Sequence, residues 1–349
     1  MDATTVAVDL AKSVFQLAEA DDQWQIVRSH RLTRRQFERF FANCCVKLVI
    51  MEACGSAHYW ARRLTELGIP VRLLPPKHVR RYVLGNKTDA ADCAALLEAA
   101  RNPKIRPVRI KGVEQQALQA LHRLRSQWMA TRTQRINGLR GFCREFGLVV
   151  PQGARIGLHA IAALVADGAS AIPAMLRSEM FATLQEVRSL EARIAQLERE
   201  LTAMVRNIPA CQLLMTIPGV GLLTATALVA AVGTDVTQFR DARRFACWFG
   251  ITPKEHSSGQ TRHLGRISKA GPRYLRMLLT HGARSVLQAA ARARSKGRDC
   301  QGLHRWALQL DARTHRNKAT CAVANKLARI CFATLRSHEP FDAARAVAA

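Results

Sequence analysis

The sequence predicts an α/β domain over roughly its first hundred residues, followed by a mainly α-helical chain. Three observations predict this. Strand-like and helix-like apolar patterns alternate up to about residue 101. Two long stretches beyond residue 112 repeat apolar side chains every three or four residues. The last third has the same helical spacing, interrupted by glycines.

The first domain begins with strands separated by short polar turns, which would form an antiparallel meander. These strands are expected at 4–10, 15–20 and 25–32. A helix over 34–41 follows. Residues 47–53, KLVIMEA, form a continuous apolar run, which is typical of a central strand covered on both faces.

Helix and strand then alternate. A helix over 57–67 ends at Gly68, and a strand over 71–74 is closed by two prolines. The last helix begins after Thr88, a good N-cap residue. Three strands, helix, strand, helix, strand, helix is the order of the RNase H-like fold.

Two long helices should follow, over 113–146 and about 181–204. The second places apolar residues in a/d alternation, which fits either an antiparallel hairpin with the first helix or a dimer contact. Together they would form a coiled-coil stalk. The polar faces of the first helix carry arginines that we expect to bind nucleic acid: Arg123, Arg125, Arg132, Arg135 and Arg140.

The charge is strongly basic and unevenly distributed. The chain carries a net charge of +27, of which residues 101–149 hold +9 and residues 240–349 hold +16. Such surfaces favour a polyanionic partner, DNA or RNA, over the second candidate, an anionic membrane surface. Two separate basic regions indicate two binding surfaces.

Secretion and membrane insertion are not expected. Ten scattered cysteines without CxxC spacing are typical of reduced thiols in a cytoplasmic protein. The acidic, strand-like N-terminus does not resemble a signal peptide. Residues 207–234 lack charge over a bilayer-spanning length, but Pro218 and three glycines break the apolar run.

Four carboxylates fall where an RNase H-like fold builds a metal site. Asp9 ends the first strand, Glu52 ends the central strand, and Asp89 and Asp92 share one face of the last helix. Carboxylates that crowd together need a cation between them, and oxygen ligands suit Mg²⁺ or Mn²⁺. Two ions about 4 Å apart could assist phosphodiester cleavage. The alternative is that Asp89 and Asp92 only complement the helix dipole.

Residues 256–276, HSSGQTRHLGRISKAGPRYLR, combine a Ser-Ser-Gly turn with many cations. We expect these cations to contact nucleic acid: Arg262, His263, Arg266, Lys269, Arg273 and Arg276. By residue type alone, the serines are more often turn residues than nucleophiles, and His263 more often a solvated loop residue. Residues 217–221, IPGVG, resemble a helix-hairpin-helix turn in which Gly219 and Gly221 could approach a phosphate, or simply a tight turn.

Taken in order along the chain, these motifs resemble the DEDD-type transposases of bacterial insertion sequences, the "one-ten" family, and within it the "eleven-eleven" subgroup. The resemblance rests on the following segments: VAVDLAKSVFQL, VIMEACGSAHYWARRL, NKTDAADCAALLEA, QRINGLRGFCREFG, IPGVG and HSSGQTRHLGRISKAGPRYLR. It implies a RuvC-like catalytic domain over 1–108, a stalk over 109–205 and a C-terminal transposase domain over 206–349. The first and last of these are similar to those of Piv-type DNA invertases.

The resemblance also implies roles for residues. The acids of the family fall on Asp9, Glu52, Asp89 and Asp92, and its nucleophilic serine on Ser258. That serine would attack a scissile phosphate, leaving a phosphoserine and a free 3′ hydroxyl. The family implies a bridge RNA that pairs with donor and target DNA, a dimer or tetramer, and a cytoplasmic, nucleoid-associated protein.

Three other functions remain open from the residues. One is an RNA-independent DNA invertase with the same active site. Another is a Holliday-junction-type metal nuclease in which Ser258 is only a turn residue. The third is a nucleic-acid-binding scaffold whose carboxylates are structural.

Overall fold

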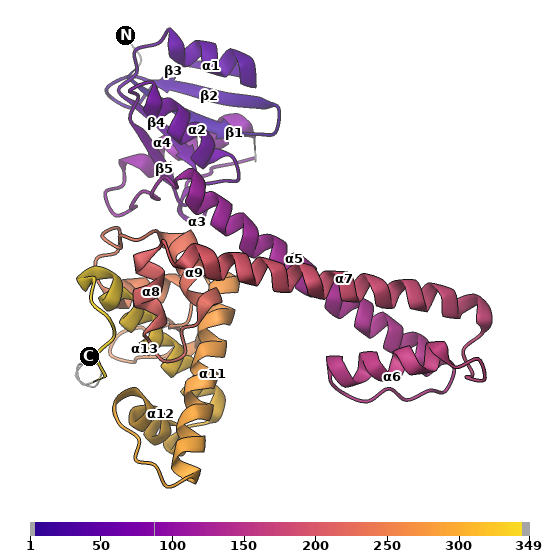
Figure 1. Ribbon diagram of the computed structural model, residues 1–349. Helices are drawn as coiled ribbons and strands as arrows, with labels where there is room; N and C mark the ends of the chain where they lie inside the picture. The colour runs from indigo at the N-terminus through magenta and orange to yellow at the C-terminus, as the bar shows by residue number, and fades with distance from the viewer. Residues whose placement is uncertain (1–3, 87, 344–349) are drawn as a thin grey trace. The chain divides into compact units, whose positions relative to one another are not determined.

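A computed structural model describes residues 4–86 and 88–343, and the chain divides after Glu114 into two compact units (Figure 1). The first unit contains a five-stranded sheet. Its strands are β1 (Thr5–Leu10), β2 (Val14–Ala20), β3 (Ile26–Thr33), β4 (Leu48–Glu52) and β5 (Val71–Leu74). These bounds agree with the sequence prediction to within one or two residues.

The strand order is β3-β2-β1-β4-β5. The first three strands form the predicted antiparallel meander, and β4 and β5 add parallel to β1. The sheet therefore places the continuous apolar run of β4 at an interior position, covered on both faces. This mixed sheet confirms the predicted RNase H-like class.

Helices cover both faces of this sheet: α1 (Arg34–Ala42), α2 (Ala57–Glu66), α3 (Pro76–Val79) and α4 (Asp89–Arg101). Strand side chains alternate between two cores. Val6, Val8 and Met51 pack with α1 and α2, and Ala7 and Ile50 pack with α4. Helix α3 was not expected; Pro76 occupies its first turn, where the missing N–H costs no hydrogen bond.

The second unit is mainly helical, with one small hairpin. Its elements are α5 (Val113–Glu145), α6 (Ala154–Ala166), α7 (Ala174–Val205), α8 (Pro209–Met215), α9 (Leu222–Val232), α10 (Ala242–Trp248), β6 (Pro253–Glu255), β7 (Leu264–Ile267), α11 (Arg273–Ser295), α12 (Gly302–Arg313) and α13 (Arg316–Ser337). The first two residues of α5 fall before the division between the units. A large apolar core joins α8 to α13.

Helices α5 and α7 lie side by side and antiparallel within the second unit (Figure 1). Of the two arrangements that the sequence allowed, this is the hairpin within one chain. Helix α7 begins at Ala174, directly after Pro173 and earlier than expected. The unpredicted α6 packs against both helices through Ile161 and Val165. The division of this unit into stalk and C-terminal domain stays a prediction.

The uncharged stretch 207–234 is folded as two short helices, α8 and α9, around the IPGVG turn. Most of α9 is buried in the core of the second unit. Within the described ranges, no helix is long and apolar enough to cross a bilayer. The ten cysteines are free thiols.

Candidate active site and nucleic-acid interface

Asp9 and Glu52 lie at the carboxyl ends of two neighbouring parallel strands. The register pairs Val8 with Met51, so Asp9 and Glu52 follow side by side. Ala7 and Ile50 face α4, and the side chains two residues further on point to the same face. Both carboxylates are half-buried.

Asp89 and Asp92 lie in the first turn of α4, as the sequence predicted. The hydroxyl of Thr88 accepts a hydrogen bond from the Ala91 N–H at 3.2 Å and caps the helix. Asp89 is exposed and Asp92 is half-buried. Their negative charge also suits a helix N-terminus, so the dipole explanation and the metal explanation are compatible.

A buried thiol lies within electrostatic reach of three of these carboxylates. Cys93 is fully buried between α4 and the sheet, and its Sγ donates to the carbonyl of Gln16 at 3.3 Å. Burial, with smaller contributions from the charges of Asp9, Asp92 and Asp89, raises the pKa of Cys93 to about 12. One side chain from β1 and two from α4 therefore share an electrostatic environment.

The carboxylates do not form a closed cage. Among residues 4–86 and 88–343, no three His, Cys, Asp or Glu side chains lie close enough to hold a metal ion. What the structure shows is a common sheet face, with Asp9 and Glu52 on adjacent strands and Asp89 and Asp92 on the covering helix. The oxygen-only donor set suits Mg²⁺ or Mn²⁺ in ligand chemistry.

Ser258 lies at the tip of the β6–β7 hairpin in the second unit. Its backbone pairs with Thr261 through hydrogen bonds of 3.2 and 3.1 Å, and Gly259 makes the turn with φ of +56°. Every residue from Pro253 to Arg266 is exposed. The sequence predicted the turn but not the two short strands that present it.

Ser257 has the structural role in this hairpin. Its Oγ donates to Glu255 Oε1 at 2.8 Å and accepts from the His263 N–H at 3.2 Å. The Ser257 hydroxyl and the Arg262 guanidinium, 3.1 Å from the same oxygen, lower the pKa of Glu255. Ser258 stands beside this network at the tip.

The base of the hairpin is held by close backbone contacts. A Cβ on Gly271 would lie 1.9 Å from the Trp248 carbonyl oxygen, so only glycine fits. Arg276 donates to the carbonyls of Phe249 and Gly271, both at 3.1 Å. Arg276 therefore has a structural role in addition to the predicted nucleic-acid contact. The other predicted cations of this segment are exposed: Arg262, His263, Arg266, Lys269 and Arg273.

Most of the predicted phosphate-binding arginines of α5 contact their own chain. Three pair with glutamates of α7: Arg125 with Glu198 at 2.7 Å, Arg132 with Glu191 at 2.5 Å, and Arg135 with Glu186 at 2.7 Å. Arg140 donates to the carbonyls of Pro151 and Gly153. These contacts hold α5, α7 and the connection to α6 together. Nucleic-acid binding by these four stays a prediction and would require them to share or exchange partners.

The IPGVG segment forms a tight turn against α11. Gly219 has φ of +87°, and a Cβ there would meet the Gly282 carbonyl oxygen at 2.7 Å. Gly221 is the exposed N-cap of α9. The close packing explains Gly219 without a ligand, and phosphate binding at this turn stays a prediction.

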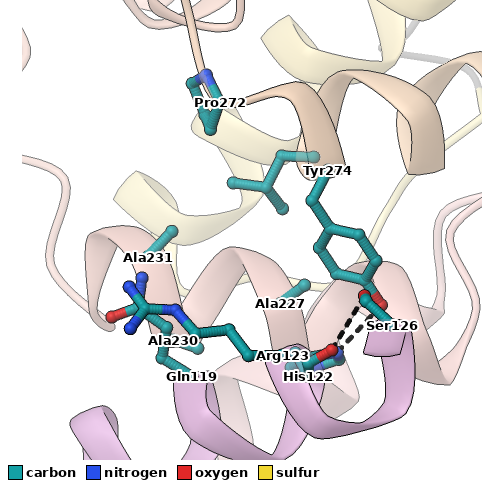
Figure 2. A pocket seen from close by; sticks show the side chains of 10 residues that line it. Gln119, His122, Arg123, Ser126, Ala227, Ala230, Ala231, Pro272 and Tyr274 are labelled. Atoms are coloured by element: carbon teal, nitrogen blue, oxygen red, sulfur yellow. Dashed lines mark hydrogen bonds between the residues drawn. The ribbon is translucent and has the colours of Figure 1, made fainter. Parts of the chain in front are cut away.

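Arg123, the remaining arginine, lines a cavity of about 310 Å³ between α5, α9 and the start of α11 (Figure 2). At its base His122 Nδ1 lies 3.1 Å from the Tyr274 hydroxyl, and Nε2 lies 3.0 Å from Thr226 Oγ1. Burial and the charge of Arg125 lower the pKa of His122 to about 4. No motif in the sequence marks this network; the only signal is that His122 follows Leu118 by one turn on the apolar stripe of α5.

Comparison with known proteins defines the class of this fold and site. Residues 6–147 match a DEDD transposase family of the IS110 type, described as "Transposase". Residues 211–298 match the transposase family IS116/IS110/IS902. The first match contains the four carboxylates and the second contains Ser258.

Similar proteins extend over nearly the whole chain. A "Probable family 20 transposase" of Pseudomonas aeruginosa is 43% identical over 96% of this chain and 97% of its own length. The "Transposase for insertion sequence element IS1111A" of Coxiella burnetii is 36% identical over 97% and 92%. A "Pilin gene-inverting protein" of Moraxella bovis is 28% identical over 46% and 48%.

The chain therefore belongs to the IS110/IS116/IS902 family of transposases, with a DEDD N-terminal domain. It is an enzyme that cuts and transfers DNA strands in transposition, and DNA is a partner. The DEDD domain implies the use of a divalent metal ion. The predicted family and its relation to pilin-gene invertases are confirmed.

Proposed function

We propose that this transposase cuts and rejoins DNA through a phosphoserine at Ser258. The proposal is supported by the exposed position of Ser258 at the tip of a hairpin with a rigid base. A nucleophile must approach phosphorus in line with the leaving oxygen, and an exposed tip permits this approach. Ser257, engaged by Glu255, is the poorer candidate.

The reaction conserves the phosphodiester bond energy. Ser258 Oγ forms a bond to phosphorus, and the bond from phosphorus to the 3′ oxygen breaks. The serine proton is lost to solvent and the 3′ oxygen gains one, which leaves a phosphoserine and a free 3′ hydroxyl. A 3′ hydroxyl from another strand then attacks the phosphoserine, which joins the strands and restores Ser258.

Asp9, Glu52, Asp89 and Asp92 are the residues that would hold Mg²⁺ or Mn²⁺, and we propose two ions. A divalent ion stabilises negative charge on the attacking and leaving oxygens when it is bound. The exposed cations of the serine segment, Arg266 and Arg273 among them, would neutralise the phosphate. The acids lie in the first unit and the serine in the second. We propose that each site takes its acids from one protomer and its serine from another, in a dimer or tetramer.

We also propose that a bridge RNA selects the donor and target DNA. The two basic regions, +9 over residues 101–149 and +16 over residues 240–349, support two nucleic-acid surfaces. Sequencing of the RNA that co-purifies with the transposase tests this: RNA from the ends of the element is expected. A preparation that recombines DNA without such RNA would instead identify an RNA-independent invertase.

Ser258→Ala with Ser257→Ala as the matched control tests the nucleophile. With a nicked substrate that traps intermediates, the wild type and Ser257→Ala should form a covalent protein–DNA adduct, and Ser258→Ala should form none. Continued cleavage by Ser258→Ala, without any adduct, would favour the metal nuclease in which water attacks.

A further inference from the structure

The segment between β5 and α4 begins and ends beside the acidic residues. Leu74, the last residue of β5, is the register partner of Glu52. Thr88, at the other end, caps the helix that starts with Asp89. Helix α3, within the segment, packs against α4. Whatever this segment binds is therefore held next to the proposed catalytic carboxylates.

The first half of the segment is firmly anchored. Val79 is buried in the core under α4. The Tyr82 hydroxyl accepts a hydrogen bond from Asn102 at 2.7 Å. Turn hydrogen bonds from the Arg80 N–H to Pro76 and from the Tyr82 N–H to Val79 fix the backbone. The side chains that point outward are thus presented from a fixed support.

Those outward side chains are cationic, with an apolar tip. Lys77, Arg80 and Arg81 are exposed, and the sequence contains no acidic residue from 67 to 88. Leu84 is 84% exposed, more than any other large apolar side chain described in the first unit. Gly85, with φ of +71°, turns the chain directly after it.

We propose that Leu84 is a wedge that inserts between DNA base pairs near the scissile phosphate, while Arg80 and Arg81 hold the flanking phosphates. This inference rests on the proposed function. Apolar side chains beside arginines unstack and kink duplex DNA in this way. Leu84 lies five residues from Asp89, hence within about 18 Å, or about five base-pair steps.

Exposure of Leu84 to water in the free protein is unfavourable, and insertion into a base stack removes this exposure. The positive surroundings favour a polyanion over a protein partner with an apolar surface. Opening of the duplex at this position would let a strand reach the carboxylates and pair with another strand. Leu84 is therefore a positioning residue rather than a catalytic one.

The test uses the transposase with its co-purified RNA and the end DNA of its element, carrying 2-aminopurine at successive positions within five steps of the cleavage point. The fluorescence of this base rises when it is unstacked. The wild type should raise it several-fold at one step. Leu84→Ala should lose that rise while the Kd for DNA changes less than about threefold, and Leu84→Phe should keep it.

Leu67→Ala is the matched control, because Leu67 is also an exposed leucine of the first unit, 53% exposed, at the end of α2. It should leave the fluorescence unchanged. Arg81→Ala should reduce the steepness of the plot of log K against log salt concentration by about 0.9, the contribution of one phosphate contact.

A fluorescence rise that persists in Leu84→Ala, or no rise in the wild type, would overturn the wedge. A smaller assembly in Leu84→Ala with unaltered fluorescence would overturn it too, and would assign Leu84 to a contact between two copies. These outcomes are separate from the proposed function, because Ser258→Ala should still show unstacking at the same step. Loss of the adduct without loss of unstacking concerns Ser258 alone.

Discussion

His122 should make the stability of the second unit depend on pH, and a substitution that cannot titrate should remove this dependence. Burial lowers its pKa to about 4, from an ordinary 6.5. Between these values the unfolded chain binds more protons than the folded one, so stability falls as the pH falls through this window. From pH 7 to pH 5 the loss is about 2 kcal/mol.

His122→Gln tests this directly. Glutamine keeps a donor and an acceptor but cannot titrate, and imperfect replacement of the bonds to Tyr274 and Thr226 should cost about 1 kcal/mol at pH 7. At pH 5 the variant should be more stable than the wild type by about 1 kcal/mol. For a unit of this size, the Tm of the wild type should fall by about 4–8 °C more than that of the variant between pH 7 and pH 5.

Scanning calorimetry of the wild type and His122→Gln at pH 7, 6 and 5 measures the difference. His58, whose pKa is also about 4, contributes equally to both proteins and cancels. If the plots of Tm against pH are parallel for the two proteins, with the variant less stable at every pH, His122 is not a buried neutral imidazole.

Three other substitutions test separate parts of the structure. Gly271→Ala should destabilise the second unit by about 2 kcal/mol or more, because the added Cβ would clash with the Trp248 carbonyl oxygen. In thermal melting, Gly265→Ala is the control without this loss, since its Cβ would lie 3.8 Å from the nearest atom. Asp89→Asn should lower strand transfer by about a hundredfold or more without weakening DNA binding. If gel-shift assays show that the variant loses DNA binding together with strand transfer, the metal role is contradicted. Arg132→Ala should cost about 1 kcal/mol through the half-exposed pair with Glu191, less in high salt; a cost that salt leaves unchanged would argue against an ionic origin.

The first unit could be predicted from the sequence because its signals are local. The apolar run of β4, the two prolines after β5 and the Thr88 cap each determine a boundary within a few residues. The placement of Asp9 and Glu52 at adjacent strand ends followed from the strand order. The strand order does not show whether the four carboxylates approach within ligand distance, because that depends on side-chain positions and on the ion itself.

The second unit was less predictable because its contacts are distant in sequence. The glutamate partners of Arg125, Arg132 and Arg135 follow only from the antiparallel register of α5 and α7. Helix α6 buries one face through Gly157, Ile161 and Val165, but apolar residues also lie on its other sides, so its sequence does not mark the buried face. The β6 and β7 strands are short and exposed, so no alternation of polar and apolar residues marked them.

The most direct test is mass spectrometry of the trapped protein–DNA adduct after nuclease and trypsin digestion. Cleavage after Lys254 and Arg262 leaves a peptide of residues 255–262, EHSSGQTR, whose fragments distinguish Ser257 from Ser258. The expected result is a nucleotide joined through its phosphate to Ser258 Oγ. A nucleotide attached to any other residue, or cleaved DNA with unmodified peptide 255–262, would contradict the account.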